Sequence, residues 1–219
     1  AFAHPRVQPH VHLSVQSGSS AVLRRMARPY AAERVLEAIA ALRAVKGDPF
    51  IASDLIAGFP GETDAEFAET LEFCAHADFA WIHAFPFSAR PGTKAWDMRP
   101  KVPERVAGER VAALSAIARE GKARYVARQA GRLVSVILEK HGNLDPDDEV
   151  SSLEASAPGA SNLAADGRGE GRAGTSSNYL KVWVEGVPQD LPAGSAVDAV
   201  LEGESALAGI DAKASLAAL

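Results

Sequence analysis

The ten residues from Asp54 to Thr63 (DLIAGFPGET) have the composition of a site for a nucleotide-like ligand. An apolar, strand-like run over Phe50–Ala57 carries one acid and is followed by Gly58 and Gly61. The letters TDAE that come next form a capping box, which predicts the start of a helix. Glycines between a strand and a helix start are expected to leave backbone amides bare at the edge of a sheet, where α/β proteins bind nucleotides. An ordinary strand-to-helix turn is the alternative interpretation.

A second predicted strand, in His10–Gly18, has one polar face. Strand alternation places His12, Ser14 and Gln16 on this face and three apolar residues on the other. We expect the apolar face to pack under helices and the polar face to point into a barrel or crevice. The dipeptide Ser17-Gly18 would then end the strand at the edge that receives a ligand.

A third predicted strand begins in the segment Trp81–Thr93 and runs into a loop that carries Arg90. Apolar residues at three- and four-residue spacing predict helices over Ala31–Val45 and Asp64–Ala77. A proline at position 103 suits the first turn of a long helix that runs to about residue 128. The alternation of strands and helices predicts a parallel sheet with helices packed outside it. We therefore expect an α/β domain over residues 1–128.

The pattern changes after residue 128, and residues 129–219 are expected to form a small all-β barrel with short strands and glycine turns. Its strands are predicted over Arg132–Glu139, Ser177–Glu185 and Ala196–Leu201. Residues from about 141 to 172 have little to bury and are interpreted as a disordered insertion. Tyr179, Lys181 and Trp183 are expected to share one strand face. Such a face can stack on bases and hold phosphate, although ordinary barrel packing is the alternative.

The composition is that of a globular chain without a membrane segment. Of the 219 residues, 47% are hydrophobic and 23% charged, and no apolar run approaches the length of a membrane span. The net charge of −5 argues against nucleic-acid binding driven by overall charge, although local basic clusters remain. The single cysteine, Cys74, lies in a predicted helix and gives no metal-binding pattern, so we expect a small buried residue. A cytoplasmic location fits these features.

Four motifs, in the order HLSVQSGS, RRMAR, DLIAGFPGET and HAFPFSARPGT, together resemble the radical-SAM methylthiotransferases that modify tRNA. The sequences of the first and last motifs are most similar to those of the branch that acts on threonylcarbamoyladenosine. The resemblance extends over roughly residues 9–132. The segment GTSSNYLKVWV resembles, more weakly, part of the TRAM domain, the tRNA-binding barrel at the C-terminus of this family.

The resemblance implies the C-terminal half of a radical-SAM barrel, a partial TIM-like barrel, followed by a TRAM-like barrel. It implies addition of a 2-methylthio group to (threonylcarbamoyl)adenosine beside the anticodon, with S-adenosyl-L-methionine (SAM) as cofactor and a reductant such as flavodoxin or ferredoxin. The complete protein would hold two 4Fe-4S clusters on cysteine thiolates. One cysteine cannot supply these ligands, so we expect a piece of a longer protein that is inactive by itself; a paralogue that lost both clusters is the alternative.

The resemblance also implies functional residues, none of them a metal ligand, and leaves the catalytic residues unknown. Those expected to bind the cofactor are Gln16, Ser17, Gly18, Arg28, Asp54, Gly58 and Gly61. Those expected to bind the anticodon stem-loop of tRNA are Arg90, Tyr179, Lys181 and Trp183. Asp54 and His83 would both face the barrel interior, where each needs a polar partner.

Three other functions remain open at this point. The chain could be a cluster-free RNA-binding module in which the barrel at the C-terminus dominates. It could belong to the branch that methylthiolates a ribosomal protein, against which the wording of the motifs argues. An unrelated α/β barrel would have to contain all four motifs by chance.

Overall fold

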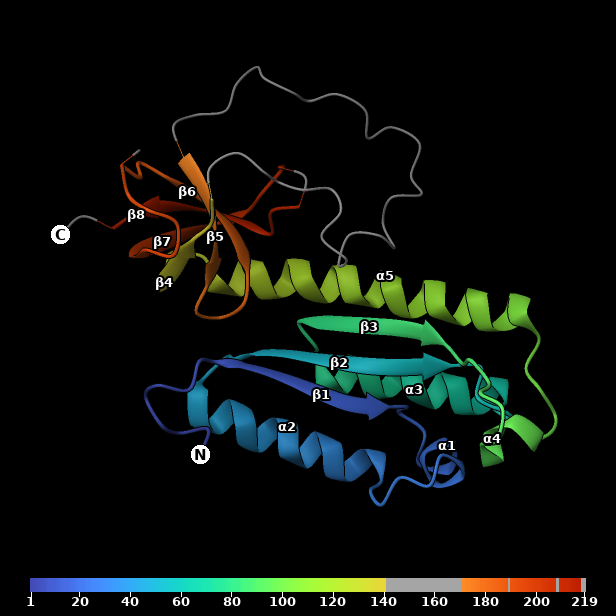
Figure 1. Cartoon of the computed structure of the whole chain (residues 1–219). Coiled ribbons are helices and arrows are strands. Elements are labelled where there is room, and N and C mark those ends of the chain that lie inside the picture. Colours follow the sequence, from blue (N-terminus) through green and yellow to red (C-terminus); the bar gives the residue numbers. More distant parts are fainter. Residues whose placement is uncertain (141–170, 189, 208, 218–219) are drawn as a thin grey trace. The chain divides into compact units, whose positions relative to one another are not determined.

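The computed structural model describes residues 1–140, 171–188, 190–207 and 209–217 (Figure 1). The chain divides into two compact units, Ala1–Tyr125 and Val126–Leu219. The boundary falls within one long helix, α5 (Glu104–Gln129). Of the helices in the described residues, none has both the length and the apolar character needed to cross a membrane.

The N-terminal unit is built on a parallel sheet of three strands in the order β1-β2-β3. Its strands are β1 (His10–Gln16), β2 (Phe50–Ala57) and β3 (Trp81–Pro86). Besides the first part of α5, its helices are α1 (Ser20–Arg25), α2 (Ala32–Lys46), α3 (Asp64–Ala77) and α4 (Lys94–Asp97). This order confirms the parallel α/β arrangement, in which helical crossovers link neighbouring strands.

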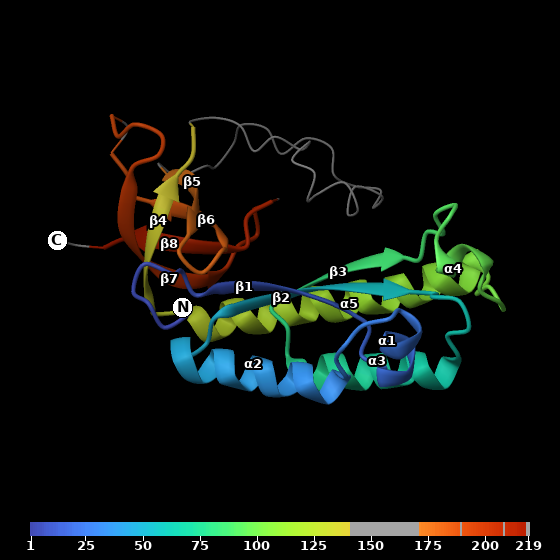
Figure 2. The same cartoon turned by 60° about the horizontal axis from the view of Figure 1, so that its bottom comes forward.

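The hydrophobic core of this unit lies on one face of the sheet, where α2 and α3 are packed (Figures 1 and 2). The cluster draws a residue from each surrounding element, among them Val15, Ile39, Leu55, Phe73, Ile82 and Leu114. The residues of opposite parity, including His12 and Asp54, lie on the other face, as the alternation of β1 predicted for His12 and Ser14. The prediction does not hold for Gln16, because the register shift pairs it with Leu55 of the core. Cys74 is 1% exposed within the core, and burial raises the pKa of its thiol to about 12.

The C-terminal unit contains a closed barrel with the strand order β4-β5-β6-β8-β7. The strands are β4 (Leu133–Leu138), β5 (Gly171–Ser176), β6 (Lys181–Glu185), β7 (Ala196–Glu204) and β8 (Ala212–Leu216). Alternate residues of β4 and β6 point inward, so that Val136, Val182 and Val184 are fully buried. Closure leaves no strand edge unpaired.

The structure corrects the predicted strands of this unit in two places. Tyr179 lies in the turn before β6, with a φ of 67°, and not on the strand. Gly171 and Arg172, the last two residues of the predicted insertion, begin β5, while residues 141–170 lie outside the described residues. β5 escaped prediction because its sequence, GRAGTS, holds no large apolar residue.

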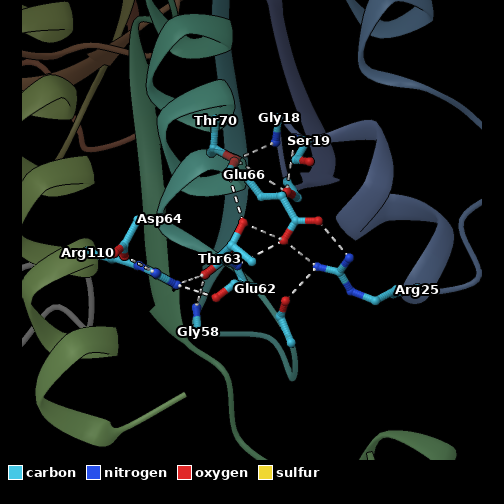
Figure 3. Close-up of polar contacts among 12 residues, drawn as sticks. Gly18, Ser19, Arg25, Gly58, Glu62, Thr63, Asp64, Glu66, Thr70 and Arg110 are labelled. Atoms are coloured by element: carbon cyan, nitrogen blue, oxygen red, sulfur yellow. Dashed lines mark hydrogen bonds and ion pairs between the residues drawn. The ribbon is translucent and has the colours of Figure 1, made fainter. Parts of the chain in front are cut away.

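The turn after β2 is held by a buried ion pair, which Figure 3 shows. The Glu62 side chain is 1% exposed and accepts a hydrogen bond from Nη1 of Arg110 at 2.7 Å and one from the Gly58 amide at 2.7 Å. Nη2 of the same arginine contacts Asp64 at 2.7 Å, at the start of α3. The pair therefore ties α5 to the point where β2 passes into α3.

A second ion pair holds α1 against the start of α3 (Figure 3). The guanidinium of Arg25 donates to both oxygens of Glu66, at 2.7 and 2.8 Å, and to the carbonyl of Gly61 at 3.3 Å. The same carboxylate accepts from the amide of Thr63, whose side chain accepts from the Glu66 amide, so the predicted capping box is confirmed. The bonds from Arg25 are the main cause that lowers the pKa of Glu66 to about 2.

Removing Arg110 is expected to destabilise the N-terminal unit strongly, because a buried carboxylate would lose its partner. Arg110→Met should lower the free energy of unfolding by about 3–5 kcal/mol, and adding Glu62→Gln should recover part of the loss. Urea unfolding in a Trp183→Phe background measures this, since Trp81 and Trp96 then report on this unit alone. The matched control is Arg105→Met, which removes an exposed pair with Glu109 and should cost less than about 1 kcal/mol. Equal losses in the two arginine variants would contradict the role assigned to the pair.

Acid should remove the stabilisation that comes from Glu66. Because its folded pKa lies below the ordinary 4.5, its contribution is present above pH 4.5 and is lost as the pH falls toward 2. The gap in unfolding free energy between wild type and Glu66→Gln should therefore be widest near pH 6 and close on acidification. Burial raises the pKa of Glu62, so the gap between wild type and Glu62→Gln should change in the opposite sense, narrowing as the pH rises. Urea midpoints at pH 6, 4 and 3 test both signs, and parallel curves would refute them.

Candidate functional site

Three polar side chains meet on the sheet face that is turned away from the core. Nε2 of His12 lies 2.7 Å from Oδ1 of Asp54, and the hydroxyl of Ser14 donates to Oδ2 of the same carboxylate at 3.0 Å. His12 and Ser14 are two residues apart on β1, and Asp54 comes from the neighbouring strand. The side chains of His12 and Asp54 remain 36% and 27% exposed. Both carboxylate oxygens thus have a protein partner, yet the cluster is open to solvent.

Aromatic rings extend this cluster along β3. His83 stacks on His12 with ring centroids 5.3 Å apart, and Phe85 lies nearly parallel to His83 at 6.5 Å. Trp81, at the other end, meets His83 edge-on at 6.0 Å and carries the ammonium of Lys122 4.1 Å above its ring. Residues at i, i+2 and i+4 of a strand share a face, so β3 presents a row of three rings. His83 therefore has ring neighbours on both sides.

His83 is favoured in its neutral form. Partial burial is the main cause that lowers its pKa, and the neighbouring His12 lowers it further. The charge of Asp54 acts in the opposite sense but is the weaker influence. The face consequently places the neutral imidazole of His83 beside the cluster of His12, Ser14 and Asp54.

Gln16 ends β1 in a strained conformation. Its φ is 76°, a region that costs a residue with a side chain on the order of 1–3 kcal/mol, and it is 8% exposed. The pairing of β1 with β2 shifts register between Leu13 and Gln16, so the strand bends there. Strain of this kind is retained where the surroundings impose it, and it is frequent at binding sites.

Ser17 and Gly18 are engaged with α3. The hydroxyl of Ser17 lies 3.4 Å from that of Thr70, which also accepts from the Gly18 amide at 3.2 Å. A Cβ on Gly18 would lie 2.5 Å from the Cβ of Phe73, so only glycine fits against this helix. In this structure the dipeptide serves to dock the end of β1 on α3.

The expectation of bare amides at Gly58 and Gly61 is wrong. The Gly58 amide donates to the carboxylate of Glu62, and the Gly61 amide donates to the carbonyl of Pro100 at 2.8 Å. Gly58 has a φ of 82° and its Cβ would lie 2.7 Å from that of Ala107, so close packing against α5 accounts for this glycine. Sequence reasoning missed the pair of Glu62 and Arg110 because its members are 48 residues apart.

Two arginines of the motif RRMAR, Arg25 and Arg28, have different environments. Arg25 makes a forked contact with a carboxylate of the same chain, that of Glu66. Arg28 is exposed after α1, where its amide donates to the carbonyl of Leu23. The structure does not bring Arg28 into the cluster around Asp54.

The residues expected to bind RNA lie in both units. Arg90 is exposed in the loop that follows β3, and its carbonyl accepts two hydrogen bonds from Thr93. On β6, Lys181 and Trp183 share the outer face of the barrel, where Lys181 contacts Glu139 at 2.5 Å. Tyr179 precedes the strand and is 55% exposed. The three barrel residues do not form one continuous strand face.

The comparisons with known proteins agree with the motifs. Residues 3–74 match the model of the radical SAM superfamily. A threonylcarbamoyladenosine tRNA methylthiotransferase of Treponema pallidum is 51% identical over 64% of this chain and 29% of its own length. A tRNA-2-methylthio-N(6)-dimethylallyladenosine synthase of Acinetobacter baumannii is 39% identical over 68% of this chain and 31% of its own length.

The chain thus spans about three tenths of the length of these relatives. A solved structure of coproporphyrinogen III oxidase from Escherichia coli, a radical SAM enzyme, aligns with 79% of this chain and 40% of its own, at a TM-score of 0.39 and 16% identity. That likeness is too low to carry an argument. The family model over residues 3–74 and the sequence relatives agree with the four motifs, and together they show that this chain is similar to the radical-SAM tRNA methylthiotransferases.

Proposed function

We propose that this chain is part of an enzyme that adds a 2-methylthio group to threonylcarbamoyladenosine beside the anticodon of tRNA. The observation that carries the proposal is the 51% identity to a methylthiotransferase named for that nucleoside. The 39% identity to a synthase named for dimethylallyladenosine supports the same reaction on a neighbouring class of substrate. The polar face around Asp54 supports a site on the sheet, because barrel enzymes bind their ligands with such inward-facing residues.

The residues of this chain fit one part of the cofactor set and not the other. SAM presents hydroxyls and ring nitrogens, for which the polar face offers hydroxyl, carboxylate and imidazole groups, with Gln16 at the end of β1. A 4Fe-4S cluster needs three or more thiolates, whereas the sequence has one cysteine, which is buried in the core. In the described residues no group of three metal-binding side chains is found. We propose that the two clusters are held by residues beyond this sequence, and that the chain is inactive without them.

The partners and location follow from the proposed reaction. The anticodon stem-loop would meet Arg90 and the outer face of β6 with Lys181 and Trp183, and the β4–β8 barrel would act as a TRAM-like tRNA-binding domain. A flavodoxin or ferredoxin would supply electrons in the cytoplasm, where tRNA is modified. The single cysteine favours a second candidate, a cluster-free RNA-binding module derived from this family.

Deleting the gene in the source organism tests the function directly. Nucleosides from total tRNA are to be separated and weighed by mass spectrometry. We expect 2-methylthio-threonylcarbamoyladenosine to disappear and its precursor without the methylthio group to accumulate, and plasmid-borne gene should restore the product. Loss of the 2-methylthio derivative of dimethylallyladenosine would instead assign dimethylallyladenosine as the substrate. An unchanged nucleoside profile would contradict the enzymatic function and favour the RNA-binding module. The reading frame upstream of Ala1 shows in parallel whether cysteine motifs precede it.

Substitutions of Gln16 in that complementation test its predicted part in binding the cofactor. Gln16→Ala and Gln16→Gly both remove the side-chain amide, so both should lower the yield of the methylthio nucleoside about 10-fold or more. Only glycine relieves the positive φ, so Gln16→Gly should be the more stable of the two by about 1 kcal/mol. Full activity in the alanine variant would contradict a ligand role for this side chain.

A further inference from the structure

The bonds around Asp54 fix which nitrogen of His12 carries the hydrogen. An ionised carboxylate can only accept, so Nε2 of His12, 2.7 Å from Oδ1, must be the donor. In the neutral form of the ring the lone pair is then on Nδ1, which is a hydrogen-bond acceptor. Ser14 occupies the other carboxylate oxygen at 3.0 Å and so helps to hold the carboxylate in place. The cluster therefore presents one defined acceptor on an open face.

The neighbouring rings give this acceptor a stacking surface. His83 lies against His12 with an interplanar angle of 28°, and Phe85 lies within 12° of the plane of His83. Phe85 is 43% exposed, so the row of rings remains accessible to a flat molecule. Aromatic and imidazole rings of this kind stack on nucleobases.

The charge of the cluster selects the kind of ligand. An ionised Asp54 carboxylate lies at the centre of the cluster and would repel a phosphate placed beside it. A neutral, planar heterocycle with an N–H donor suits both the acceptor and the rings. The exocyclic amine of adenine is such a donor.

We infer that His12, oriented by Asp54 and Ser14, is a positioning residue that accepts a hydrogen bond from an adenine moiety stacked beside His83. This inference rests on the proposed function and deepens it. Adenine occurs both in SAM and in the nucleoside to be modified, and the geometry at His12 suits either. Asp54 acts through His12 and does not itself contact the base.

The test uses the full chain labelled with ¹⁵N in its histidines. In the free protein, the ring-nitrogen shifts of His12 should show the form with hydrogen on Nε2, and Asp54→Ala should mix the two tautomers. The hydrogen bond to Asp54 fixes this tautomer whatever the role of the ring, so the response to adenosine is the readout that a merely structural role would not give. Added adenosine should shift the signals of His12 and His83, whereas inorganic phosphate should not. Adenosine that leaves both histidines unmoved overturns the inference.

Substitutions at His12 separate positioning from folding. His12→Ala should weaken adenosine binding about 3- to 10-fold, the loss of one hydrogen bond. His12→Gln can both donate to Asp54 and offer an acceptor, so it should restore most of the affinity. Asn178→Ala, in the other unit, is the matched control and should bind as the wild type does. Equal weakening in the alanine and glutamine variants would overturn the assignment.

Two further probes decide the source of the adenine. Shifts with SAM but not with an anticodon stem-loop RNA would assign the site to the cofactor, and the reverse would assign it to the target nucleoside. Either result supports the role of His12. If neither SAM nor the RNA shifts the signals of His12 and His83, the inference is overturned. Failure here would leave the nucleoside profile of the deletion strain unaffected, so the inference and the proposed function can fail separately.

Discussion

The N-terminal unit depends on a carboxylate that is cut off from water. Glu62 is 1% exposed at its side chain and is stabilised by the guanidinium of Arg110 and the amide of Gly58. An ion buried in this way costs several kcal/mol unless its partners are complete. The position of α5, the left-handed turn at Gly58 and the start of α3 are therefore coupled.

Alternate residues of each strand point to opposite faces of the sheet, and only one of these faces carries the core. One set of side chains packs with α2, α3 and α5, while the other set includes the polar cluster of His12 and Asp54 and the ring of His83. A parallel strand covered on both faces would be apolar throughout. The alternation in β1 is thus a direct sign that one face is kept for something other than the core.

Much of this was predictable from sequence, and the failures have physical causes. β2 and α3 begin and end where predicted, because an apolar run bounded by glycine and a capping box are local signals. Strand parity likewise predicted the shared face of His12 and Ser14. Asp54 lies 42 residues from its partner His12. Their pairing depends on the register of β1 against β2, which no local sequence pattern contains. The same holds for Arg110, which binds the Glu62 carboxylate that engages the Gly58 amide, and for Tyr179, which a positive φ removed from β6.

The geometry around Glu62 also makes its ion pair directional. Exchanging the two residues, with arginine at 62 and glutamate at 110, would conserve the charges. However, the Gly58 amide would then face a guanidinium, which has only donors, and would be left without an acceptor. Charge complementarity alone therefore cannot restore the turn. In relatives that keep this turn, positions 62 and 110 should change in side-chain size or polarity more readily than they exchange glutamate for arginine.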